Sequence, residues 1–338
     1  MRSTLLTYLV CPECRSELTV GSDGPPGAIV GEGSLTCAKG HAFPIVRGVP
    51  DFVGGALDVS IERTAANFGD QWRRFPEDHA AHRQQFLDWI APVGPEDFEG
   101  KVTVELGCGM GRHARLAGGF GASAHIAVDV SEAVFVASDL TADQPNVHVI
   151  RADLFKLPLR GGADLVFSVG VLHHTPDPRR AFAALLGCTR PRGRFAAWVY
   201  GRENNGWIVR VVNPLRRMTS RLPAAALYRV SQALAWGAFI PLVKLVYDPL
   251  GRLFPAAARR LPYGRYLTYV SRFAPRQLHA IVHDHLAAPV AHYLSREDLM
   301  DIIAASPVDE LVLRHHNGMS WLVTGRRRPQ SGSRRETL

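Results

Sequence analysis

A short apolar segment that breaks into three glycines constrains this chain most. Residues Val102–Leu106 form a β-branched run, and Gly107, Gly109 and Gly111 follow at alternate positions. Glycines at such positions let the backbone turn sharply and leave room for a ligand, while a following helix offers free N–H groups. The acid Glu105 stands at the end of the run, where it suits a cationic or zwitterionic ligand better than a phosphate. The pattern predicts a strand, a tight ligand-binding loop and a helix.

Four further apolar runs continue an alternation of strand and helix. They are His125–Asp129, Val147–Asp153, Ala163–His174 and Gly193–Tyr200. Such alternation predicts an α/β fold with a doubly wound, mostly parallel sheet and right-handed crossovers. Asp129 lies eighteen residues after Gly111, close to the ~20 expected for an acid that accepts hydrogen bonds from ribose hydroxyls. The alternative for Asp129 or Asp153 is a helix-capping or turn role.

In this order the elements resemble the class I S-adenosylmethionine-dependent methyltransferases, of the type 11 kind. The resemblance implies a Rossmann-like sheet of seven strands that binds S-adenosyl-L-methionine and releases S-adenosyl-L-homocysteine. It places the adenine amino group at Asp153, and one departure, Pro191-Arg192-Gly193 in place of the usual Pro-Gly-Gly, touches only a turn. The residues predicted to bind the cofactor are Glu105, Gly107, Cys108, Gly109, Gly111, Asp129, Val130, Asp153, Leu154 and Val169.

The N-terminal segment has the spacing of a metal site. Cys11 and Cys14 form a C-x-x-C pair, and Cys37 and His41 form a C-x-x-x-H pair. Two such knuckles can converge on one tetrahedral zinc ion, and a segment of ~50 residues buries too little apolar surface to fold without such support. A redox pair is the competing interpretation of C-x-x-C, but no strand-helix context follows Cys14. We predict a structural zinc site, in a module that resembles the zinc ribbon at the head of some methyltransferases, ribosomal RNA guanine methyltransferases included.

Length and composition indicate more than one domain. The chain has 338 residues and is 46% hydrophobic, which is enough for a full-sized core and additional modules. The predicted parts are a zinc-ribbon head (1–55), a helical linker or cofactor lid (56–98), the cofactor-binding core (99–200), a helical substrate cap (201–290), completion of the core by a helix and two strands (291–328), and a disordered basic tail (329–338).

Two of these parts leave alternatives open. In the linker, Phe68, Trp72 and Phe75 repeat at helical spacing, so Trp72 is either a core residue or a lid over the cofactor. In the cap, Leu227–Tyr247 is apolar and flanked by arginines, which suits either an amphipathic surface for membranes or lipid-like substrates, or a packed helix pair that lines a hydrophobic pocket. We favour the packed pair.

Candidates for chemistry are few. His173 and His174 end the fourth predicted strand, where either imidazole could accept a proton from a hydroxyl nucleophile, or simply pack. Asp284 is a third catalytic candidate, within a histidine-rich stretch (279–292) that could alternatively hold a second metal or line a pocket.

The net charge of the chain and its expected compartment limit the functions that it can have. The net charge is +8, and part of it lies in the C-terminal tail, so a nucleic-acid partner is possible but not favoured. The chain has no uninterrupted apolar run of ~18 residues, so we expect no stable membrane insertion. The cysteine usage suggests the cytoplasm. We predict methyl transfer to an oxygen or nitrogen of a small, hydrophobic or glycosylated metabolite. The alternatives are an RNA methyltransferase that docks through the zinc ribbon, and a binding protein that does not methylate. The sequence does not indicate an oligomeric state.

Overall fold

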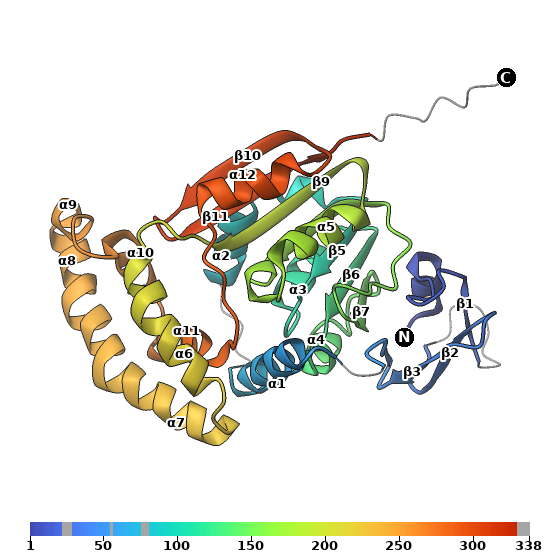
Figure 1. Ribbon diagram of the computed structural model, residues 1–338, viewed down its shortest axis with the longest axis horizontal. Coiled ribbons are helices and arrows are strands. Elements are labelled where there is room, and N and C mark those ends of the chain that lie inside the picture. The colour runs from blue at the N-terminus through green and yellow to red at the C-terminus, as the bar shows by residue number, and fades with distance from the viewer. Residues whose placement is uncertain (22–28, 55–56, 76–80, 330–338) are drawn as a thin grey trace.

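The computed structural model describes residues 1–21, 29–54, 57–75 and 81–329. The predicted basic tail therefore lies outside the described residues, apart from Pro329. Along the longest axis of the molecule a small N-terminal head stands at one end, a helical cap stands at the other, and a large sheet lies between them (Figure 1).

The central sheet has seven strands in the order β10-β11-β9-β8-β5-β6-β7. Strands β5 to β9 are parallel to one another, and β11 and β10 are antiparallel additions at one edge. The chain runs from β5 outward to β7 and then returns to the other side of β5 as β8, so the switch in direction lies between β5 and β8. Ligands of open α/β sheets bind at the carboxyl ends of strands at such a point. The predicted doubly wound sheet is confirmed. The strands are β5 (Val102–Leu106), β6 (Ala124–Asp129), β7 (Val147–Arg151), β8 (Ala163–Val169), β9 (Thr189–Tyr200), β10 (Val308–His316) and β11 (Ser320–Arg327).

Helices cover both faces because side chains of the buried strands alternate between two cores. Val166 on β8 packs with α5 (Pro178–Cys188) and α12 (Arg296–Ala304) on one face. Phe167, its neighbour, packs with α2 (Ala81–Ile90) on the other face. Also on that second face, α3 (Arg112–Gly119) and α4 (Ala133–Leu140) pack against β6 and β7. Short 3-10 helices stand at Pro95–Asp97 (η2) and Leu172–His174 (η3).

The head is a four-stranded antiparallel sheet that shares a hydrophobic core with the domain. It docks on the far side of β7, where the guanidinium of Arg151 pairs with the carboxylate of Asp51 at 2.9 Å. The backbone N–H of Val10 also donates to the carbonyl of Pro158 at 2.8 Å. These bonds and the shared core join the head to the domain. Its elements are η1 (Ser3–Tyr8), β1 (Leu18–Val20), β2 (Gly33–Cys37), β3 (Ala42–Val46) and β4 (Val49–Pro50).

The cap follows β9 and is built around α11 (Pro275–Ala287), which contacts α1 (Val59–Arg74), α6 and α7. Its longest part is one continuous helical run, Ala224–Leu253, that includes α7 and α8 and forms the outer edge of the molecule (Figure 1). The remaining elements are η4 (Ile208–Val212), α6 (Asn213–Thr219), α7 (Ala224–Leu234), η5 (Ala235–Phe239), η6 (Leu242–Tyr247), α8 (Asp248–Leu253), α9 (Pro255–Ala258) and α10 (Gly264–Val270).

The chain then returns to the sheet through α12. The hydroxyl of Ser295 accepts a hydrogen bond from the backbone N–H of Asp298 at 3.1 Å, and the Asp298 carboxylate accepts from the N–H of Ser295 at 2.8 Å. This reciprocal cap satisfies two N–H groups that a helix start leaves unpaired. Ser295 and Asp298 have the three-residue spacing that such a cap requires.

Candidate active site

The glycine loop after β5 has a backbone that side chains would disrupt. Gly107, Gly109 and Gly111 have φ angles of +85°, +51° and +86°. A Cβ at Gly107 would collide with the side chain of Val171, and one at Gly111 would lie 2.9 Å from the Cα of Ala137. The three glycines are therefore required by backbone conformation and by close packing together.

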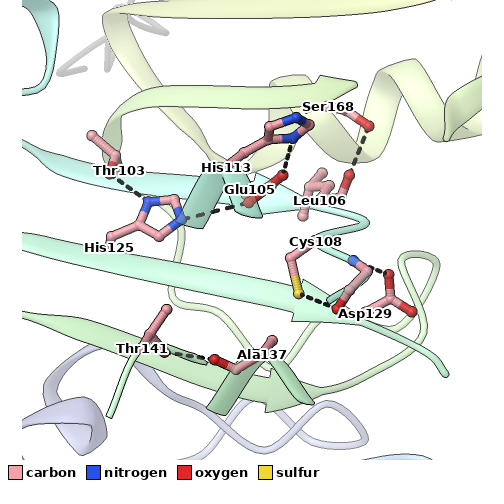
Figure 2. A network of polar contacts seen from close by, with 11 residues as sticks. Thr103, Glu105, Leu106, Cys108, His113, His125, Asp129, Ala137, Thr141 and Ser168 are labelled. Atoms are coloured by element: carbon pink, nitrogen blue, oxygen red, sulfur yellow. Dashed lines mark hydrogen bonds and ion pairs between the residues drawn. The ribbon is translucent and has the colours of Figure 1, made fainter. Parts of the chain in front are cut away.

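Asp129 at the end of β6 is fixed by its neighbours. One carboxylate oxygen accepts from the N–H of Gly109 at 2.8 Å, and the other accepts from the N–H and hydroxyl of Ser131 at 2.8 and 2.7 Å. Figure 2 shows the bond to the loop. Asp153, after β7, is held similarly by the N–H of Phe155 at 2.9 Å. Each carboxylate oxygen has more than one lone pair, so both acids keep capacity to accept from a ligand.

Glu105 lies behind the loop and not in it. Its carboxylate is fully buried and accepts from Nδ1 of His113 at 3.0 Å, while Nε2 of His125 lies 3.8 Å away (Figure 2). Burial raises the pKa of the Glu105 carboxyl. In this arrangement Glu105 joins β5 to the first turn of α3 and to β6. It does not line the cavity described next, so a direct contact with the cofactor remains a prediction.

A cavity of about 380 Å³ extends from the glycine loop to the cap. Its first half is formed by the loop and by the residues that follow β6, β7 and β8. Of the ten residues predicted to bind the cofactor, eight line it, and Glu105 and Gly111 do not. The eight are Gly107, Cys108, Gly109, Asp129, Val130, Asp153, Leu154 and Val169.

Trp72 covers the loop from α1. A Cβ at Gly109 would lie 2.9 Å from the indole Nε1 of Trp72, which shows how closely the ring approaches the loop. The guanidinium of Arg112 stacks over the same ring at 4.9 Å from its centroid. Trp72 therefore lines the cavity, in the place that the lid alternative requires.

The second half of the cavity is a chamber of aromatic rings beneath the cap. Trp89 and Trp198 have centroids 4.8 Å apart, and Tyr200 and Tyr293 stack at 5.4 Å. Tyr266, Tyr269 and Phe273 close it from the cap side. Sequence reasoning missed this chamber because its rings come from segments far apart in the chain. It also placed the pocket wall wrongly: no residue of Leu227–Tyr247 lines the cavity, and α10 and α11 do so instead.

Two of the predicted catalytic residues reach the chamber. Asp284 accepts from the hydroxyl of Tyr200 at 2.9 Å and from Nε2 of Gln71 at 3.4 Å. Nδ1 of His174 lies 2.7 Å from the carbonyl oxygen of Val290. Since a carbonyl only accepts, Nδ1 carries the proton and Nε2 is left as an acceptor. Burial lowers the pKa of His174 to about 4, so the ring is neutral at pH 7.

His173 lies behind the chamber. Its side chain is fully buried, it does not line the cavity, and burial lowers its pKa well below the ordinary value. The prediction that this histidine pair contributes a base therefore rests on His174 alone. The other histidines of the stretch do not gather into a second metal cluster among the described residues. Instead, His279 and His283 share the hydroxyl of Ser231, at 3.0 and 2.9 Å.

The four predicted metal ligands of the head converge. The ligand atoms of Cys11, Cys14, Cys37 and His41 all lie within 4.8 Å of one another. Nδ1 of His41 is 3.4 Å from the sulfur of Cys11 and 3.3 Å from that of Cys37. The hydroxyl of Ser16 lies 3.0 Å from the sulfur of Cys14, and its hydrogen bond lowers the pKa of that thiol to about 6. This donor set fits a tetrahedral ion.

Comparison with known proteins supports the assignment of the first half of the cavity to the cofactor. Residues 104–197 match the sequence model of a family described as a methyltransferase domain. The tRNA U34 carboxymethyltransferase of Methylococcus capsulatus is 34% identical over 154 residues, which are 41% of this chain and 46% of that protein. The enzyme of the same name from Trichlorobacter lovleyi is 29% identical over 188 residues, 54% of this chain and 51% of that protein. The chain thus matches about half the length of these relatives.

Among solved structures, magnesium protoporphyrin IX methyltransferase from Synechocystis PCC 6803 with bound S-adenosylmethionine aligns with 81% of this chain and 100% of its own. The TM-score is 0.44 and the identity 14%. The segment that matches the family model, residues 104–197, contains the glycine loop, Asp129 and Asp153. It spans the parallel strands β5 to β9. It is a class I S-adenosylmethionine-dependent methyltransferase domain of the type 11 family.

Proposed function

We propose that this protein transfers a one-carbon group from S-adenosylmethionine to a nucleotide base of RNA. The observation that carries the proposal is the continuity of one cavity, from the cofactor loop of a methyltransferase domain into a chamber of aromatic rings. The curated relatives support RNA as the acceptor, since they are named for a tRNA nucleotide. This reverses the preference drawn from the sequence, which placed a small metabolite first.

The cofactor would be held by groups already in position. Asp129 would accept from the ribose and Asp153 would face the adenine, while the loop at Gly107 and Gly109 lets the ligand approach the backbone. Bound S-adenosylmethionine supplies an electrophilic methyl group on a sulfonium. Because that group is already reactive, the chain contributes mainly position and exclusion of water. Trp72 and the cap helices would provide the exclusion.

A flipped base fits the chamber chemically. Proteins that read single-stranded RNA stack unpaired bases on aromatic rings, and such stacking is worth roughly 1–3 kcal/mol per base. Trp198 and Tyr200 on β9 provide rings from the sheet side of the chamber. Asp284 is the carboxylate of the aromatic half, and His174 offers a neutral acceptor nitrogen. We assign Asp284 to accept the proton of the attacking nitrogen or oxygen, and His174 to orient it.

The cap carries an excess of positive charge. Between residues 201 and 290 there are thirteen Lys and Arg against three Asp and Glu. Arg276 itself lines the cavity from α11. An RNA acceptor would use such charges to neutralise phosphates, and its binding would weaken steeply as salt rises.

The test is transfer of labelled methyl from S-adenosylmethionine to total tRNA and ribosomal RNA, across a salt series. The expected result is label that is lost on ribonuclease digestion, with turnover that falls as salt rises. Trp198→Ala should raise KM for RNA roughly ten-fold. Its matched control is Trp207→Ala, whose ring is 60% exposed and outside the cavity, and which should leave KM unchanged. Mass analysis of the modified nucleoside identifies the base that carries the methyl group.

A second candidate is methyl transfer to a hydrophobic metabolite, and the apolar character of the chamber favours it. A small apolar molecule would be enclosed by Tyr266, Tyr269 and Phe273 without any need for phosphate contacts. The same assay separates the two acceptors. Label that is insensitive to ribonuclease, extractable into organic solvent and independent of salt would reject RNA and establish the metabolite.

We further propose that the head binds one structural zinc ion. With Zn–S bonds of about 2.3 Å, two thiolates of a tetrahedral site lie roughly 3.8 Å apart. The sulfurs of Cys14 and Cys37 lie 3.7 Å apart. All four predicted ligands are used, so the site is closed and leaves no position for catalysis.

A further inference from the structure

The outer face of the cap exposes apolar side chains to an unusual degree. Of the eighteen large hydrophobic residues exposed among the described residues, fourteen lie between Trp207 and Leu261. The most exposed are Leu245 at 75% and Met218 and Leu253 at 71%. Burial of such side chains is worth about 1.5–3 kcal/mol each, so this many on one part of the chain favours a covering partner.

These side chains follow the helical repeat. Trp207, Val211, Leu215 and Met218 are spaced by three or four residues from the start of η4 through α6, and Leu222 follows in the turn after α6. A second stripe runs along the continuous helix from α7 to α8, with Val230, Leu234, Leu242, Leu245 and Leu253. Periodic exposure of this kind is the pattern of a helix whose apolar face is meant to be covered.

The exposed charged side chains on this part of the chain have one sign. Every exposed charged residue between 201 and 290 is an arginine, and none of the three acids is exposed. The exposed arginines are Arg202, Arg210, Arg217, Arg221, Arg229, Arg252, Arg259, Arg260, Arg265, Arg272 and Arg276. Arginine next to exposed leucine, tryptophan and phenylalanine is the composition of helices that lie in the interface of anionic membranes.

The helix Ala224–Leu253 has the length and mean hydropathy (1.4) of a membrane-spanning segment, with 28% of its most apolar window buried. Its inner face is committed to the cap. Ser231 bonds to His279 and His283, Lys244 donates to the carbonyl of Ser271 at 2.6 Å, and Tyr247 donates to that of Pro262 at 2.8 Å. A helix that crossed the bilayer would break these bonds. The geometry fits a helix that lies flat, with its outer face in the lipid.

We propose that the outer face of the cap, formed by η4, α6 and the helix Ala224–Leu253, docks on the surface of a bilayer that contains anionic lipids. Leucine, valine and methionine distinguish this partner from RNA, which offers phosphates and base rings but no apolar interior. The docking surface contains none of the residues that line the cavity except Ile208, and it lies at the end of the molecule opposite the head (Figure 1). The inference goes beyond the proposed function and does not depend on the acceptor.

The test is flotation of the full chain with vesicles of phosphatidylcholine, with and without phosphatidylglycerol, in the absence of cofactor and RNA. The expected result is flotation that strengthens with phosphatidylglycerol and weakens with salt. Leu245→Ser and Leu253→Ser should each weaken partitioning about ten-fold. Arg221→Gln and Arg229→Gln should each weaken it about five-fold, and only when anionic lipid is present.

The matched controls are Met300→Ser on α12, 37% exposed, and Arg296→Gln at the start of the same helix. Both should float as the wild type does. Circular dichroism checks that each variant is folded, which its exposed position favours. Wild-type protein that stays unbound to either vesicle would overturn the inference, and so would flotation unchanged by the cap variants. Light scattering that shows a dimer lost in Leu245→Ser would also overturn it, since a second copy would then cover the face. None of these results bears on methyl transfer.

Discussion

The carboxylate of Asp129 accepts a hydrogen bond from the backbone N–H of Gly109, at 2.8 Å, and so joins the end of β6 to the glycine loop after β5. Both residues also line the cavity. One side chain therefore shapes the loop and, in our proposal, receives the ribose. The conformation of the loop therefore depends on β6, because any other conformation would separate the N–H of Gly109 from its charged partner.

Asp129→Ala should weaken binding of S-adenosylhomocysteine by ten-fold or more. Hydrogen bonds to a charged group contribute about 1.5–3 kcal/mol, and the variant removes those to the ribose together with the support of the loop. Titration calorimetry measures the effect. Asp139→Ala is the control, because its carboxylate is 73% exposed and pairs only with Arg47 among the described residues. Equal affinity in wild type and Asp129→Ala would refute the assignment.

Gly111→Ala should destabilise the domain more than Gly162→Ala, although both glycines have a φ of +86°. The shared backbone conformation costs an L-residue roughly 1–2 kcal/mol. Only at Gly111 does the new Cβ also meet a neighbour, the backbone of Ala137, whereas Gly162 has open space. Crowding of this kind adds about 1–3 kcal/mol. Urea denaturation that gives the same loss for both variants would show that the close packing of α3 on α4 contributes nothing.

The purified protein should contain one zinc ion per chain, and Cys14→Ser should lose it. The head would then lose the ion that holds its two knuckles together, while the seven-stranded sheet keeps its own core. Metal analysis and circular dichroism read the two effects separately. Cys188→Ser is the control, since Cys188 is buried in α5 and outside the cluster. Protein that is free of zinc after mild purification would exclude the site, as would retention of zinc by Cys14→Ser.

Stability should fall as the pH drops from about 6.5 to 4. Burial, aided by the nearby charges of Arg2 and the N-terminus, lowers the pKa of His148 to about 4, below the 6.5 of the unfolded chain. In this window the unfolded state binds a proton that the folded state does not. Each pKa unit corresponds to about 1.4 kcal/mol, so this histidine alone contributes roughly 2–3 kcal/mol of the loss.

The check is urea denaturation at a series of pH values for wild type and His148→Gln. The variant should be less pH dependent between pH 6.5 and 4, and the two curves should run parallel above pH 7, where the histidine is neutral in both states. Curves that run parallel over the whole range would show that His148 does not titrate with the lowered pKa.

The sequence by itself determined the parts of this protein that depend on neighbours in the chain. Gly107, Gly109 and Gly111 predict the loop because positive φ angles and close approach are local demands. The Cys11–Cys14 and Cys37–His41 spacings predict two knuckles for the same reason, and the sheet follows from strands that alternate with helices.

Tertiary structure decided the rest. Glu105 has the sequence position of a ligand-binding acid, yet His113 and His125 approach from α3 and β6 and make it a buried brace. The aromatic chamber unites Trp89, Trp198 and Tyr266, which no spacing relates. The sequence of Leu227–Tyr247 predicts a pocket wall. Its apolar residues are more numerous than its inner face can bury, so many of them face outward. Which face of an apolar helix is covered depends on what packs against it, and that is decided only when the distant parts of the chain come together.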